Sequence, residues 1–182
     1  MKSWLISSTA LALACAAASC TTPSGGASAL TAPMTLVSAT GAGASVGDIA
    51  ISNGSNGVVF ALHLHGLPPG DHGFHLHANG SCDPGAGPNG AMGAAGAAGG
   101  HYDPANTGRH EGPTGAGHMG DLPLVHVGAD GTATERLVAP HLHVADELRG
   151  HALIIHANGD NYSDTPAPLG GGGSRIACGV VR

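Results

Sequence analysis

The chain has 182 residues, enough for one domain with a short appendage. Charged residues make up only 10% of it, and 32 glycines and 12 prolines are scattered too densely for an architecture of long helices. Six Lys and Arg stand against twelve Asp and Glu, and the only lysine is Lys2, so the chain lacks the basic patch that nucleic acid binding requires. Large apolar residues are scarce enough for disorder to be one alternative. If the chain folds, we expect short strands and ordered loops held together by something besides apolar burial.

The N-terminal segment has the features of a secretory signal. Lys2 is followed by an apolar, Ala-rich run from Trp4 to Ala18, which is too short to span a membrane. Small residues precede Cys20, an arrangement that resembles a bacterial lipoprotein signal in which Cys20 is lipidated; cleavage after a small residue without lipidation is the alternative. We therefore expect residues 1–19 to be a signal peptide and residues 20–33 a flexible tether. Either form of processing exports the domain from the cytosol.

Export makes the number of cysteines informative. Cys15 falls inside the expected signal peptide and Cys20 at its boundary, which leaves Cys82 and Cys178. In an oxidising compartment two remaining cysteines are typical of one disulfide, with two unpaired thiols as the alternative. Closing a loop of about a hundred residues would stabilise the fold by about 4–5 kcal/mol.

From about residue 34 the mature chain shows short alternating runs. The clearest places Val58, Phe60, Leu62 and Leu64 on one strand face, and Leu67–Gly70 ends that strand. Further strands are expected at 74–77, 122–127, 152–156 and 175–181, a hairpin turn at Asp130-Gly131, and one helical turn near residues 146–149. Short strands with turns between them indicate an antiparallel sandwich or barrel over residues 34–182.

A segment of almost forty residues, from 83 to 121, has almost no periodic apolar pattern. A compact domain rarely carries such a segment unless it is functional or disordered. His101, His110, His118 and Asp121 lie within it, in a chain that has 13 histidines. These side chains predict a loop organised by a metal ion.

His75 and His77 are two residues apart on an expected strand, so both imidazoles project to the same side while Phe74 and Leu76 face the core. Two imidazoles favour copper or zinc. The pairs His63/His65 and His141/His143 have the same spacing, but we interpret these as polar residues facing solvent.

The order of the motifs resembles the copper/zinc superoxide dismutase family, and the loop layout is most similar to its bacterial periplasmic branch. The resemblance covers about residues 34–182 and rests on six ordered segments: 70–77, 99–104, 109–113, 118–122, His156 with Asp160, and 172–180. It implies a Greek-key antiparallel β-barrel or sandwich of immunoglobulin-like type with long metal-binding loops.

The resemblance also implies a role for each site residue. His101 would bridge the two metals and act in catalysis, Asp160 would link a copper ligand to a zinc ligand, and His72 would be structural. Arg175 would hold the substrate anion at the mouth of the copper channel, and Cys82 and Cys178 would form a disulfide. The implied copper ligands are His75, His77, His101 and His156, and the implied zinc ligands are His101, His110, His118 and Asp121.

The implied activity is dismutation of superoxide to oxygen and hydrogen peroxide, by alternate reduction and reoxidation of one copper per chain beside one structural zinc. The implied location is the bacterial periplasm, with membrane attachment if Cys20 is lipidated. The family contains both homodimers and monomers, and this sequence selects neither. The alternatives are a non-enzymatic exported copper/zinc-binding protein of the same fold and a loosely structured metal scavenger rich in histidine.

The resemblance leaves two features of this sequence unexplained, namely the lack of charge near the active-site rim and the surplus of histidines. Periplasmic relatives commonly carry lysines near the active-site rim, whereas residues 85–100 have no charge here, so Arg175, Arg109 and the metals must supply the attraction for an anion. We therefore expect a weak dependence of the rate on salt. No role is assigned to the surplus histidines, which are His63, His65, His126, His141, His143 and His151.

Overall fold

The computed structural model describes Met1 and residues 30–87 and 90–182. The predicted signal peptide, the lipidation site at Cys20 and most of the predicted tether lie outside these residues. Across the described ranges, no helix has the length and apolar character needed to cross a membrane.

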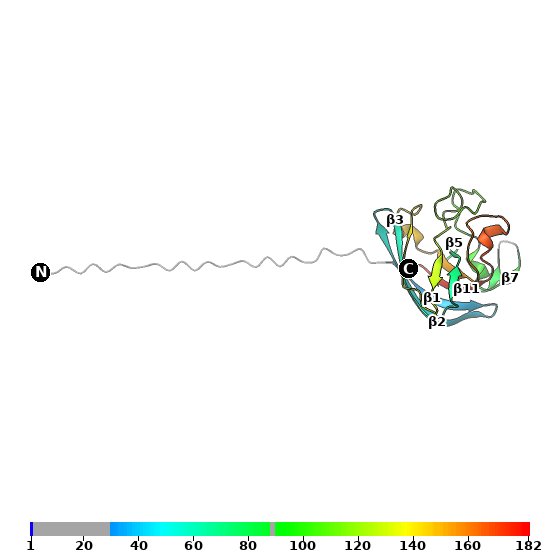
Figure 1. Ribbon diagram of the computed structural model, residues 1–182, viewed down its shortest axis with the longest axis horizontal. Helices are drawn as coiled ribbons and strands as arrows, with labels where there is room; N and C mark the ends of the chain where they lie inside the picture. Colours follow the sequence, from blue (N-terminus) through cyan, green and yellow to red (C-terminus); the bar gives the residue numbers. More distant parts are fainter. Residues whose placement is uncertain (2–29, 88–89) are drawn as a thin grey trace.

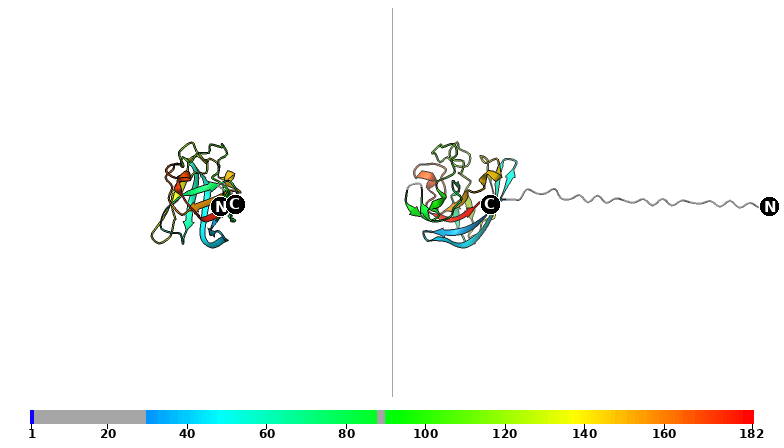
Figure 2. Two further views of the ribbon diagram at one scale, coloured as in Figure 1. Left: turned by 90° about the vertical axis from the view of Figure 1, so that its right-hand side faces the viewer. Right: turned by 180° about the vertical axis from the view of Figure 1, so that it is seen from behind.

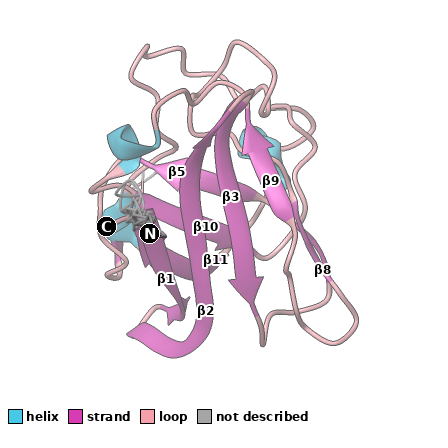
Figure 3. Cartoon of the chain, turned by 90° about the vertical axis from the view of Figure 1, so that its left-hand side faces the viewer, coloured by secondary structure: helices cyan, strands magenta, loops and turns pink. Residues whose placement is uncertain are grey.

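The fold is a curled antiparallel sheet of seven strands, which confirms the all-β prediction (Figures 1 and 2). The spatial order is β5-β10-β11-β1-β2-β3-β9. Figure 3 shows β5, β10 and β11 lying across from β2 and β3, as in half of a barrel. The strands are β1 (Leu30–Ser38), β2 (Gly41–Gly54), β3 (Gly57–Leu64), β5 (Phe74–His77), β9 (Arg136–Ala139), β10 (Ala152–His156) and β11 (Arg175–Val180).

Smaller elements complete the described structure. They are β4 (Gly70–His72) paired with β8 (Val125–Val127), β6 (Gly85–Ala86) paired with β7 (Met92–Gly93), and the 3₁₀ turns η1 (Gly96–Ala98), η2 (Ala145–Leu148) and η3 (Pro168–Gly171). The helical turn expected at 146–149 corresponds to η2. A strand is expected over residues 122–127, and the structure has β8 over the second half of that range. The next strand, after the turn at Asp130-Gly131, is β9.

The core lies inside the curl of the sheet. Val58, Phe60, Leu62 and Leu64 are all buried, as the alternation predicts, and the rings of Phe60 and Phe74 pack edge to face with centroids 5.6 Å apart. This packing joins β3 to the strand that carries His75 and His77.

The first strand begins at Leu30, four residues earlier than the pattern near residue 34 indicates. Leu30, Ala32 and Met34 alternate inward and are buried. Thr31 and Arg182 exchange backbone hydrogen bonds of 3.2 and 2.9 Å, which fasten this early start to the C-terminus. The residues of β1 that precede Met34 are therefore stabilised by a contact with the other end of the chain.

Cys82 and Cys178 form a disulfide with their Cα atoms 5.7 Å apart. Cys178 lies on β11, and Cys82 opens the long loop that leads to His101. The disulfide thus holds this loop against the sheet. The loop and the segment from Ala157 to Ser174 lie side by side at one side of the sheet (Figure 1).

Candidate metal centre

The edge of β5 gathers most of the predicted ligands. His77 forms a bridge of β type with His101, and His75 forms one with Asp121. On the other side of β5, β10 pairs with it and ends at His156. Backbone pairing therefore brings residues from three distant parts of the chain to one place.

Four buried imidazoles form the first cluster. His75, His77, His101 and His156 each offer a nitrogen, and these atoms lie within 4.8 Å of one another. The rings are packed closely, with the centroids of His75 and His101 only 3.9 Å apart. The predicted copper ligands therefore come together in one group.

In three of these rings, one nitrogen makes a hydrogen bond and the other makes none within the described structure. Nδ1 of His77 bonds the carbonyl of Gly99 at 3.0 Å, and Nδ1 of His156 bonds that of Gly173 at 3.1 Å. Nε2 of His75 bonds Asp160 at 2.7 Å. Within the described structure, the opposite nitrogens, His75 Nδ1, His77 Nε2 and His156 Nε2, are buried without a hydrogen-bond partner. Buried lone pairs of this kind fit metal ligation, because a metal ion supplies the missing partner.

The protonation of the cluster suits a metal. Burial, and next the nearby His101, lower the pKa of His75 and of His77 well below the usual value. Burial also lowers the pKa of His101, and it lowers that of His156 to about 4. These imidazoles are therefore neutral at pH 7, the form that binds a cation.

Asp121 is the centre of the second cluster. Its Oδ1 lies 2.9 Å from His101 Nδ1, 2.9 Å from His110 Nδ1 and 3.3 Å from His118 Nδ1. Donors around a tetrahedral zinc ion with bonds of about 2.0 Å are separated by about 3.3 Å. Three imidazoles and a carboxylate are also an acceptable zinc set. The spacing and chemistry of the predicted zinc ligands thus fit that ion.

His110 and His118 enter this cluster differently. His110 Nδ1 lies close to Asp121 yet makes no hydrogen bond within the described structure, as expected when two atoms aim at a common point. The four donors that lie within 4.8 Å of one another are those of His75, His101, His110 and Asp121, and His118 joins them through Asp121. His75 falls within this group of donors because its ring stacks on that of His101. Its Nε2, however, is hydrogen-bonded to Asp160.

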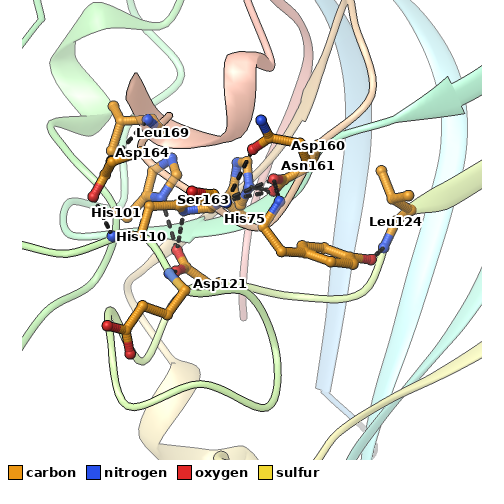
Figure 4. A network of polar contacts seen from close by, with 12 residues as sticks. His75, His101, His110, Asp121, Leu124, Asp160, Asn161, Ser163, Asp164 and Leu169 are labelled. Atoms are coloured by element: carbon orange, nitrogen blue, oxygen red, sulfur yellow. Dashed lines mark hydrogen bonds and ion pairs between the residues drawn. The ribbon is translucent and has the colours of Figure 1, made fainter. Parts of the chain in front are cut away.

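Asp160 connects the two clusters, as Figure 4 shows. It accepts hydrogen bonds from Nε2 of His75 at 2.7 Å and from Nε2 of His110 at 2.8 Å. Burial opposes ionisation, yet the bonds from His110 and His75 hold the pKa of Asp160 well below its usual range. Burial likewise lowers the pKa of His110, but its close contacts with the carboxylates of Asp121 and Asp160, at 2.9 and 2.8 Å, outweigh this and raise the value to about 9.

A cavity of about 840 Å³ opens onto the first cluster, lined by His77, His101, His156 and Arg175 among others. The half-buried Arg175 donates hydrogen bonds to the carbonyls of Ala95 and Gly99 at 2.5 and 2.6 Å. Among the described residues that line the cavity, Arg175 is the only one with a permanent charge. The arrangement can hold a small anion beside a metal.

Arg109 does not line this cavity. It pairs with Glu111 at 3.2 Å on the loop surface, with its side chain mostly exposed. Of the two arginines expected to attract an anion, Arg175 is therefore the one that reaches the cavity.

The other histidines have separate surroundings. His72 is buried, with Nδ1 2.7 Å from the carbonyl of His156 and Nε2 2.8 Å from that of Pro68, which is a structural role. His63 and His126 are exposed and pair with Asp48 and Asp71.

Sequence reasoning missed two residues that support the site. The hydroxyl of Tyr162 accepts a hydrogen bond from Leu124 N at 3.0 Å, and Asp164 accepts one from His110 N at 2.9 Å. Both tie the loop after Asp160 to the loop that carries the second cluster. Their roles depend on contacts between segments that are far apart in the chain, and no spacing pattern in a single sequence predicts such contacts.

Comparisons with known proteins agree with this geometry. A family model described as copper/zinc superoxide dismutase (SODC) matches residues 45–181. The chain is 56% identical over 149 residues to superoxide dismutase [Cu-Zn] 2 of Salmonella typhimurium, covering 82% of this chain and 86% of the relative. It is 54% identical, with the same coverage, to superoxide dismutase [Cu-Zn] of Escherichia coli.

Solved structures give the same result. Cu/Zn superoxide dismutase from Brucella abortus matches with a TM-score of 0.80 and 51% identity, over 84% of this chain and 98% of that one. The monomeric copper, zinc superoxide dismutase from Salmonella enterica matches with a TM-score of 0.73 and 55% identity, over the same shares. Both similarities extend over nearly all of the solved chains.

Proposed function

Since the chain belongs to the copper/zinc superoxide dismutase family and converts superoxide to oxygen and hydrogen peroxide, we propose which of its residues carry out this reaction. Copper is bound by His75, His77, His101 and His156, and zinc by His101, His110, His118 and Asp121. Copper, when bound, supplies the reversible one-electron chemistry that dismutation needs, whereas zinc supplies a fixed charge without redox change.

The observation that carries the copper assignment is the set of unpartnered nitrogens. His75 Nδ1, His77 Nε2 and His156 Nε2 are buried, neutral at pH 7 and grouped with His101. The nitrogens across each ring are held by a carboxylate or a carbonyl, so the rings are already oriented. Such bonds fix ring orientation in metal-binding histidines.

His101 is the residue shared by the two sites. Its Nδ1 lies 2.9 Å from Asp121 Oδ1, and the same ring belongs to the group of four imidazoles. Serving two cations removes both ring protons, which only strong local positive charge can achieve. With Nδ1 directed at Asp121, the opposite nitrogen of His101 would be the one to hold copper, and without copper it would hold a proton for the formation of peroxide.

Arg175 holds the substrate. Its guanidinium is oriented by the carbonyls of Ala95 and Gly99, which use two of its five N–H donors. The remaining donors are available to bind superoxide in the cavity beside the copper ligands. Among the described residues that line this cavity there is no lysine, so the positive charge of Arg175 is the one that attracts the anion.

The direct test is to load the oxidised, purified chain with copper and zinc and to measure bound metal and superoxide consumption together. We expect one ion of each metal per chain and fast turnover. His77→Ala should lose copper and activity, whereas His63→Ala, which changes an exposed histidine paired with Asp48, should keep both. Several weakly held ions without turnover would contradict the assignment.

We further propose that residues 1–19 are a signal peptide and that the domain works in the periplasm, with Cys20 available for lipidation. The disulfide between Cys82 and Cys178 supports this, because such bonds persist in oxidising compartments. Fractionation of cells, with mass spectrometry of the mature N-terminus, tests the location, and Cys20→Ala tests the lipid anchor. The relative from Salmonella enterica is a monomer, so we propose a monomer here as well, to be tested by sedimentation.

A further inference from the structure

His151 belongs to neither proposed ligand set, yet it contacts the backbone of a copper ligand. Its Nδ1 lies 2.9 Å from the carbonyl oxygen of Ala78 and 3.2 Å from that of His77. Since a carbonyl can only accept, Nδ1 carries the proton and donates it to these two oxygens. His151 therefore holds the peptide that follows His77.

The same ring also contacts the segment of the bridging ligand. It lies against Tyr102, with ring centroids 4.5 Å apart and an angle of 50° between the planes. Tyr102 follows His101, and its backbone N–H bonds the carbonyl of Leu76 at 2.8 Å. One side chain thus contacts the backbone after His77 and the side chain after His101, in the two segments that meet where these residues pair.

The backbone of His151 is itself well anchored. Its N–H bonds the carbonyl of Leu148 at 3.1 Å, and its carbonyl accepts a bond from Val181 N at 3.0 Å. The next residue, Ala152, begins β10 and pairs with His77 in the sheet. The ring therefore projects from a fixed base onto the end of β5, from outside the buried metal cluster.

We propose that His151 is a positioning residue that fixes His77 and His101 relative to one another. This inference rests on the proposed function, in which both residues bind copper. Because the carbonyl of His77 belongs to the same residue as the ligand ring, a rotation of the peptide after it would move the Cα and redirect Nε2. The hydrogen bond from His151 Nδ1 resists that rotation at the carbonyl side of this peptide, while Ala78 N holds the other side through its bond to the carbonyl of Gly100 at 3.0 Å. The ring contact with Tyr102 steadies the opposite segment.

Two substitutions separate the hydrogen bond from the ring. His151→Phe keeps a flat ring against Tyr102 but removes the donor. His151→Asn places an amide N–H near the position of Nδ1 but removes the ring. If the hydrogen bond positions His77, the Asn variant rescues what the Phe variant loses. His63→Phe is the matched control, because the side chain of His63 is exposed on β3 and pairs with Asp48.

The experiment compares these variants with the unmodified chain, each loaded with both metals. Two quantities are measured: the electron paramagnetic resonance spectrum of bound Cu²⁺, and the copper affinity by competition with a chelator. For His151→Phe we expect a changed copper hyperfine splitting and roughly three- to tenfold weaker copper binding, below the 10- to 100-fold typical when a side chain that bonds the ligand ring itself is lost. His151→Asn and His63→Phe should match the unmodified chain, and zinc content should stay at one per chain throughout. If the Phe variant does not fold, His151→Ala replaces it with the same expectation.

A Phe variant with an unchanged spectrum and copper affinity would overturn the proposal, as would Phe and Asn variants that are altered to the same degree. The outcome is separable from the proposed function. If the unmodified chain fails to bind copper, or if His77→Ala still binds it normally, the ligand assignment itself is wrong. If His77→Ala loses copper and His151→Phe does not, only the positioning role fails.

Discussion

Gly170 packs directly against the carboxylate of Asp160. A Cβ at residue 170 would overlap Oδ1 of Asp160 and lie 2.8 Å from Nε2 of His110. Gly170 also has a φ of +70°, which favours glycine over any residue with a side chain. The loop that covers the carboxylate can therefore approach this closely only because residue 170 is glycine.

Gly170→Ala should displace Asp160 from His110 and weaken zinc retention by about tenfold or more. Gly171→Ala is the matched control, because Gly171 has a φ of +75° but its Cβ would meet only Ala167, at 3.5 Å. Both variants lose about 1–2 kcal/mol of stability from the backbone conformation. Zinc affinity by chelator competition separates them, and equal zinc affinities would contradict the steric argument.

Asp160→Asn tests the link between the clusters. An amide cannot accept hydrogen bonds from both His75 and His110 with the strength of a carboxylate, so both rings lose orientation. We expect zinc affinity to fall by about 10- to 100-fold, and copper affinity to fall as well. Asp103→Asn is the control, since Asp103 bonds only backbone and hydroxyl groups of its own loop. Unchanged metal binding in Asp160→Asn would rule out the bridging role.

Much of the site follows from local rules applied to the sequence. His75 and His77 are two residues apart on a strand, so their rings had to share a side, and the buried alternation from Val58 to Leu64 is seen as expected. The resemblance to the family, carried by the order of the motifs, then implies His101, His110 and His118 as partners. The structure brings these residues together by pairing β5 with the long loop.

The remainder depends on contacts between distant segments. The start of β1 is held by the pairing of Thr31 with Arg182, and the hydrogen bond from His151 to the carbonyl of Ala78 joins residues more than seventy positions apart. From the sequence alone, Arg109 is expected to help attract the substrate anion, but its pairing with Glu111 is visible only in three dimensions. Such contacts depend on which distant segments pair and on how the loops pack, and local periodicity specifies neither.

The disulfide should contribute a large part of the stability. Because Cys82 and Cys178 are 96 residues apart, the loop-entropy relation gives about 4–5 kcal/mol. We expect Cys82→Ser to lower the free energy of unfolding by about that amount in urea denaturation, and to lower activity, since the released loop carries the carbonyls that orient Arg175. Reduction of the unmodified chain should give the same result. A loss below about 1 kcal/mol would show that the loop is held by other contacts.

The rate should depend weakly on salt. Arg175 is the only permanently charged residue among the described residues of the cavity, and it is half-buried, where counterions screen less. We expect the rate constant to change less than about threefold between low and physiological ionic strength. Met92→Lys places a charge at an exposed position of the same cavity. This variant should react faster at low salt and show a steeper dependence, whereas a steep fall in the unmodified chain would refute the prediction.

Zinc uptake by the metal-free chain should release a proton at neutral pH. Burial lowers the pKa of His110, but the two carboxylates beside it, Asp121 and Asp160, raise it to about 9, so this ring is protonated at pH 7 and must lose a proton to become a ligand. Apparent zinc affinity should therefore rise by up to about tenfold per pH unit until pH approaches 9. His156, with its pKa lowered to about 4 by burial, is already neutral and adds no such dependence to copper binding at pH 7.

Calorimetry in two buffers of different ionisation enthalpy measures the protons released when zinc binds. About one per zinc is expected at pH 7, fewer in Asp160→Asn, and none at all would contradict the raised pKa of His110.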